Sequence, residues 1–169
     1  MTERVKPDET ADERTSLLQV LDYQRATLIL KAQGLTSEQL HQVHPPSTLT
    51  LGGLLKHLSL NEDSWIRERF LGLPMNEPWL SAPFDEDPDW EFHSAADDTA
   101  EELVSLYEMA CERSRKAIEG VPLDQRAVVA NSAGDWTLRW VLLHLIEETA
   151  RHCGHADLIR ESIDGVVGE

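Results

Sequence analysis

Four long stretches of this sequence repeat apolar residues at helical spacing, and none alternates apolar and polar residues long enough to predict a sheet strand. Val128-Val129-Ala130 is at best a short extended piece. Amphipathic helices without strands bury their apolar faces against one another, so the sequence predicts an all-α four-helix bundle. The expected helices cover approximately residues 12–33, 50–72, 99–120 and 137–165.

Helix start and stop signals bound these stretches. Thr50 is a plausible N-cap, and Thr99 is followed three residues later by Glu102. Thr36 with Gln39 resembles a capping box, which predicts a short extra turn of helix. Glycines follow the ends of the stretches, where the chain must leave the helical conformation: Gly34, Gly72, Gly120 and Gly165.

Length and composition narrow the class of protein. The 169 residues suit one domain, 1–169, in which residues 1–10 are expected to form a flexible tail. A net charge of −16 and a pI near 4.7 exclude a nucleic-acid partner, because no basic face could release counterions. The sequence shows neither an apolar run long enough to span a membrane nor a secretory leader, so we expect a cytoplasmic protein with no membrane partner. Cys111 and Cys153 are expected to be buried free thiols, as suits a reducing compartment.

The connection 74–98 is far longer than the usual link between bundle helices. It contains four aromatic residues, and residues 85–102 hold nine acidic residues and no Lys or Arg. A disordered linker would not need the aromatic area, so we expect a packed lid over one end of the bundle. The acidic residues are interpreted as its solvated face. The four aromatic residues are Trp79, Phe84, Trp90 and Phe92.

Three ionisable residues interrupt the apolar face of the fourth helix. Glu148 and His152 are four residues apart, so their side chains lie on one face one turn apart. A buried charge needs a partner, which could be the other side chain, another helix or a cation. The face as a whole comprises Val141, Leu145, Glu148, His152, His155 and Ile159.

His57, at the inner edge of the second helix, is the natural third ligand for a cation. Two imidazoles and a carboxylate suit zinc or another divalent transition metal, and three ligands leave one coordination position open. The competing interpretation is a set of hydrogen-bonded histidines and a helix-surface pair. His144 is interpreted as a flanking residue, and His155 as a neighbour of the site or a substrate contact.

Two tracts of the sequence resemble the DinB-like superfamily, over essentially the whole chain. The branch it resembles most contains short actinobacterial proteins related to the N-terminal domain of mycothiol-dependent maleylpyruvate isomerase. The resemblance implies a four-helix bundle, usually a homodimer, with a divalent metal held by His57, Glu148 and His152. Zinc is the expected metal, and Ni²⁺ is an alternative. The tracts are residues 55–65, with His57, Glu62 and Trp65, and residues 136–157.

The resemblance also implies a metal-dependent thiol S-transferase that joins a low-molecular-weight thiol, with mycothiol favoured, to a small electrophile. His155 is then expected to contribute a catalytic hydrogen bond near the site. Maleylpyruvate isomerase activity is not expected, because the sequence ends shortly after the fourth helix. Three alternatives stay open: a non-catalytic metal-binding or small-molecule-binding dimeric module, a structural homodimer whose buried polar cluster is vestigial, and a hydrolase that uses zinc-bound hydroxide.

Overall fold

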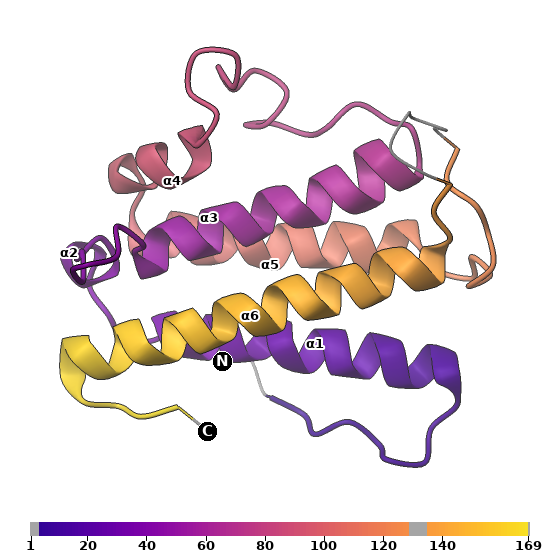
Figure 1. The fold of residues 1–169 in the computed structure, drawn as a ribbon, viewed down its shortest axis with the longest axis horizontal. Coiled ribbons are helices and arrows are strands. Elements are labelled where there is room, and N and C mark those ends of the chain that lie inside the picture. Colours follow the sequence, from indigo (N-terminus) through magenta and orange to yellow (C-terminus); the bar gives the residue numbers. More distant parts are fainter. Residues whose placement is uncertain (1–3, 129–134, 169) are drawn as a thin grey trace.

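The computed structural model describes residues 4–128 and 135–168, and its helices pack as a four-helix bundle (Figure 1). The predicted all-α fold is confirmed. Within the described residues, no helix is both long and apolar enough to cross a membrane. In chain order the helices are α1 (Glu13–Ala32), α2 (Ser37–Leu40), α3 (Leu51–Glu62), the π-helix η1 (Asp63–Phe70), α4 (Trp90–Ser94), the 3-10 helix η2 (Ala95–Asp97), α5 (Ala100–Ala117) and α6 (Leu138–Asp164).

Local signals set the helix ends as predicted. The side chain of Thr50 accepts a hydrogen bond from the Gly53 N–H, and Thr137 caps α6 in the same way. Capping boxes form at Thr36 and Thr99. These contacts satisfy N–H groups that the first turn of a helix leaves unpaired.

The second predicted helix is not a single α-helix. It follows α-helical geometry as far as Glu62 and then continues as the wider π-helix η1 to Phe70. At this junction Glu62 and Asp63 are both buried. Glu62 accepts two hydrogen bonds from the buried Arg25 of α1, and Asp63 accepts two from Asn76. These partners lie far away in the sequence, so the helical period alone did not reveal the change.

Helices α3 and α6 lie next to each other in the bundle and are the two that carry the candidate ligands (Figure 1). Their facing sides contribute buried apolar residues from Leu51 to Leu58 on α3 and from Val141 to Ile159 on α6. The candidate residues therefore lie between two helices at the margin of the apolar core, where His152 is buried and His57 and Glu148 are half-buried. This placement suits a site that must hold side chains in a fixed geometry.

The connection 74–98 is packed, but it does not cover an end of the bundle. It folds over the side of α3 and contains α4, which contacts α3 directly (Figure 1). Trp79 anchors it with a side chain that is 1% exposed, and Trp90 packs edge-on against Trp79. The expected lid is thus present, at a different position. The side of α3 provides the apolar surface that these aromatic rings need.

The short extended piece predicted at residues 128–130 begins next to a backbone contact between distant segments. The Val128 N–H donates to the Phe70 carbonyl, and Arg126 forms an isolated antiparallel bridge with Thr137. Val129 and Ala130 lie outside the described residues.

Candidate metal centre

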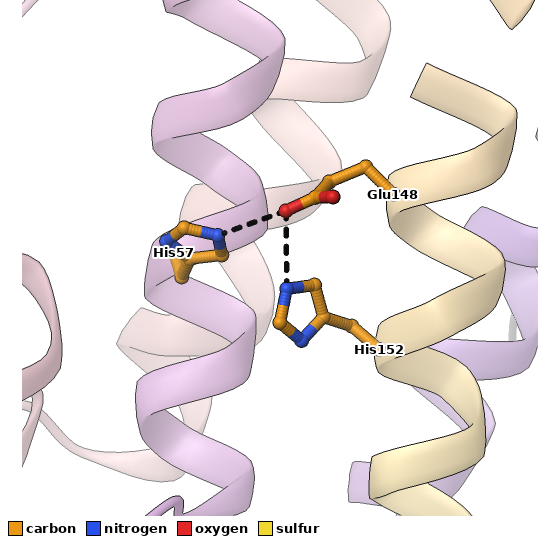
Figure 2. A group of neighbouring side chains, drawn as sticks. All are labelled: His57, Glu148 and His152. Atoms are coloured by element: carbon orange, nitrogen blue, oxygen red, sulfur yellow. Dashed lines mark hydrogen bonds and ion pairs between the residues drawn. The ribbon is translucent and has the colours of Figure 1, made fainter. Parts of the chain in front are cut away.

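His57, Glu148 and His152 converge between α3 and α6 (Figure 2). One ligand atom from each lies within 4.8 Å of the other two. The Glu148 Oε1 is 3.5 Å from the His57 Nε2 and 3.2 Å from the His152 Nε2. Four ligands ~2.1 Å from a tetrahedral zinc ion lie ~3.4 Å apart, so these two separations match such a site.

The environment favours the ligand forms of these side chains. Burial opposes ionisation of Glu148, but the neighbouring His152 and His57 bring the pKa of Glu148 below its ordinary value. Burial and the neighbouring His57 lower the pKa of His152. At neutral pH the pair therefore favours a carboxylate and a neutral imidazole, the forms that bind a metal.

Hydrogen bonds around His57 fix its tautomer. The His57 Nδ1 lies 2.9 Å from Oε1 of Glu91, and a carboxylate can only accept there, so Nδ1 carries the hydrogen. The His57 Nε2 accepts from the Asn61 side-chain amide at 2.9 Å. The Nε2 lone pair therefore points away from Glu91 and is available to a cation that displaces the amide. Histidine ligands of metals commonly have such a carboxylate on the other ring nitrogen.

Glu91 was missed in the sequence, where the acidic run was interpreted as a solvated face. Its side chain is buried, and Asp98 of the same run pairs with the buried Lys56, so that interpretation is wrong for these two residues. One signal could have identified Glu91: it is flanked by Trp90 and Phe92, two residues that the lid was expected to bury.

Phe92 shields the same histidine. Its ring stacks on that of His57, with centroids 4.6 Å apart and planes at 21°. A Cβ at Gly53 would lie 3.1 Å from the Phe92 ring, so the glycine permits this close approach. The lid thus gives His57 an apolar cover and, through Glu91, a charged partner.

The other histidines of the fourth helix have distinct places. The His155 Nδ1 lies 3.3 Å from the His152 Nδ1, one turn along α6 from the ligand cluster. His144 is not among the three clustered residues. Its ring stacks on that of Trp140 and packs at a tilt against that of Trp65, and burial lowers its pKa. This position agrees with its interpretation as a flanking residue.

The two cysteines are buried in surroundings that disfavour the thiolate. Both are free and buried, as predicted, and burial raises the pKa of each thiol to about 12. Cys153 follows His152 in the sequence, but its Sγ donates to the carbonyl of Gln24 on α1.

Comparison with known proteins identifies one family. The family model described as MST, mycothiol S-transferase, matches residues 16–165, which include all four long helices except the first turn of α1. No curated protein matches the chain significantly.

Proposed function

Because the chain belongs to the mycothiol S-transferase family, we propose that it joins the sulfur of mycothiol to a small electrophile at a divalent metal centre. His57, Glu148 and His152 would hold the metal, for which zinc is the first choice and Ni²⁺ the second. The family supports the thiol and the class of reaction. The metal, its ligands and the electrophile are the parts that we propose.

The observation that carries the proposal is the convergence of three ligand atoms from two helices. The donors are two imidazole nitrogens and one carboxylate oxygen, a set that binds divalent transition metals. The His57 Nδ1–H is committed to Glu91, which leaves Nε2 as the ligand atom. A divalent metal bound by this set would lower the pKa of a thiol that reaches it.

The chain's own residues prepare the site for that chemistry. Glu91 holds the ring of His57, and Phe92 excludes water from one face of that ring. When His152 binds a metal through Nε2, its Nδ1 carries the hydrogen and donates to His155. We therefore propose that His155 is a positioning residue that acts through His152.

The overall reaction balances without an oxidant or reductant. The thiol loses its S–H proton to the buffer, and its sulfur forms a bond to carbon. The bond between that carbon and the leaving group breaks, and the leaving group takes the electron pair. No cysteine of the chain is needed, in agreement with the inert state of Cys111 and Cys153.

Replacing one ligand tests the metal site. His152→Ala should abolish stoichiometric binding of zinc while the helical circular dichroism persists, because only two of three donors remain. Elemental analysis of the purified variant measures this. His93→Ala is the matched control, since His93 is exposed and contacts only Asp87 among the interactions resolved at its ring. One tightly bound ion retained by His152→Ala would show that the ligand assignment is wrong.

An assay with several thiols tests the reaction. The zinc-loaded protein is mixed with a bromobimane and with mycothiol, bacillithiol or glutathione, and formation of the thioether is followed. Mycothiol should give a rate well above the uncatalysed one. Loss of electrophile without any thiol would indicate the hydrolase instead. No rate above background with all three thiols would leave a binding module without turnover.

A further inference from the structure

Asn61 contacts the atom through which His57 would bind a metal. It follows His57 by one turn of α3, and its side-chain Nδ2 lies 2.9 Å from the His57 Nε2. This nitrogen is the proposed ligand atom, because the Nδ1–H of the same ring is held by Glu91. Asn61 is not one of the three clustered residues, yet it lies directly against one of them.

The tautomer of His57 determines which end of the Asn61 amide faces the ring. Because the ring hydrogen is on Nδ1, the Nε2 carries a lone pair and only accepts hydrogen bonds. The oxygen of an amide also only accepts, so the group that faces Nε2 is the NH₂ of Asn61. The same NH₂ lies 3.3 Å from the backbone carbonyl oxygen of His57. Two acceptors of one residue therefore hold the amide in this orientation.

The surroundings of the His57 Nε2 require a donor or a cation. Oε1 of Glu148 lies 3.5 Å from this nitrogen, so a carboxylate oxygen and a nitrogen lone pair face each other. Neither atom has a hydrogen to give to the other. Among the described residues, the amide of Asn61 is the donor at this nitrogen. A divalent ion would take its place and would pair with the carboxylate as well.

The lone pair of Nε2 cannot serve the amide and a metal at once. An imidazole nitrogen has a single lone pair in the plane of its ring, so a metal-bound Nε2 accepts no hydrogen bond. The hydrogen bond from Asn61 to this nitrogen therefore exists only in the metal-free protein. A contact that is made in the metal-free state alone reduces the fraction of molecules that are ready to bind, and it lowers the apparent affinity for the metal.

Asn61 also restrains the imidazole, which on its own would favour binding of a metal. The orientation of the ring does not depend on this restraint, however. Glu91 holds the Nδ1–H, and the ring of Phe92 stacks on the imidazole with centroids 4.6 Å apart. Because two other side chains position the ring, competition for the lone pair is the larger effect of Asn61. One hydrogen bond of this kind corresponds to a ~2- to 10-fold change in affinity.

We propose that Asn61 is a placeholder for the metal, a side chain that occupies the Nε2 lone pair of His57 until an ion displaces it. Asn61 thereby helps to set how tightly the site holds its metal. The proposal rests on the proposed metal centre and adds a residue that determines its affinity. Removing this residue should strengthen binding of the metal, whereas removing a ligand should weaken it.

Competition with a chromophoric chelator tests the proposal. Asn61→Ala should bind zinc ~2- to 10-fold more tightly than the wild type, because water replaces the tethered amide at Nε2. Gln42→Ala is the matched control, since it removes an exposed carboxamide from the segment before α3 and should leave the affinity unchanged. Equal affinity in Asn61→Ala and the wild type would overturn the proposal. Weaker binding in Asn61→Ala would make Asn61 a ligand or a support of the ligands, and would also overturn it.

A crystal structure of the metal-free wild type tests the contact itself. After treatment with EDTA, the Nδ2 of Asn61 should lie within hydrogen-bonding distance of the His57 Nε2. In the zinc-loaded protein the ion should occupy that side of Nε2, and the amide should have turned away from it. A metal-free structure in which the amide already points elsewhere would show that Asn61 is no placeholder.

The outcomes separate this proposal from the one on which it rests. Stoichiometric zinc in the wild type, with an unchanged or lower affinity in Asn61→Ala, would reject the placeholder and keep the metal centre. No stoichiometric zinc in either protein would reject both. Stoichiometric zinc in both, with the tighter binding in Asn61→Ala, would support both.

Discussion

Glu91 places a buried carboxylate against the candidate ligand His57. Its Oε1 holds the Nδ1–H of the imidazole, while its Oε2 is buried with no hydrogen-bond partner in the described part of the chain. A buried anion that is only half satisfied costs free energy unless a positive charge lies near it. A divalent ion on the opposite nitrogen of His57 would supply that charge. The unpaired Oε2 of Glu91 thus favours a cation at His57, and this observation is separate from the convergence of the three candidate ligands.

Glu91→Gln should weaken binding of zinc by ~10- to 100-fold and leave the helical content unchanged. The amide oxygen of glutamine can still accept from His57, so the loss reports the missing charge rather than a missing hydrogen bond. Competition with a chromophoric chelator measures the affinity. Glu86→Gln removes an exposed acid from the same segment and should have no effect. Equal affinity in both variants would exclude a role for Glu91 in metal binding.

At the scale of elements, the packed connection 74–98 determines whether Glu91 and Phe92 reach His57. This segment has only two short helices of its own, α4 and η2, so its position depends on buried aromatic area. Trp79 anchors this segment to the bundle, since its side chain is almost fully buried and contacts Trp90. The packing of Trp79 therefore stabilises the lid, although Trp79 lies 12 or more positions before Glu91 and Phe92, the residues that the lid places beside His57.

Trp79→Ala should destabilise the protein by ~3–5 kcal/mol, because it leaves a large cavity under the lid. It should also weaken binding of zinc, since Glu91 and Phe92 lose their support. Urea denaturation and chelator competition measure the two effects. Leu80→Ala is the neighbouring control, with a side chain that is 61% exposed and an expected change below ~0.5 kcal/mol. A Trp79→Ala protein as stable as the wild type would contradict the anchoring role.

At the scale of the whole molecule, the candidate ligands connect the two halves of the chain. His57 comes from α3, and Glu148 and His152 come from α6, so a bound ion would link the helices only in the folded state. A ligand that binds the native state alone stabilises it by mass action. Metal binding at these residues would therefore be coupled to global stability.

Free zinc at 100 times its dissociation constant should stabilise the protein by ~2.7 kcal/mol. For a domain of this length that corresponds to a rise in Tm of ~5–10 °C, which differential scanning calorimetry can measure. EDTA should reverse the rise, and Ca²⁺, which prefers oxygen ligands, should not reproduce it. A wild-type Tm that does not respond to zinc, or a His152→Ala protein that responds equally, would contradict coupling through this site.

Features that depend on neighbouring residues could be predicted from the sequence alone. The helices that begin after Thr50, Thr99 and Thr137 are each capped by that threonine, whose side chain accepts from the backbone N–H three residues later. The Glu148–His152 pair likewise follows from helical spacing. The third candidate ligand, His57, needed the resemblance to a known family as well as the apolar pattern of its helix.

Contacts between residues far apart in the sequence became visible only in the folded structure. Glu91 is 34 positions from His57, and His44 is 118 positions from Ser162, so no local pattern links either pair. The lid lies on α3 rather than at the end of the bundle, and α3 widens into η1 where Glu62 and Asp63 meet distant partners. These features depend on long-range packing and on pairing buried charges. Periodicity and capping report only the conformational preferences of contiguous residues, and so they cannot specify such contacts.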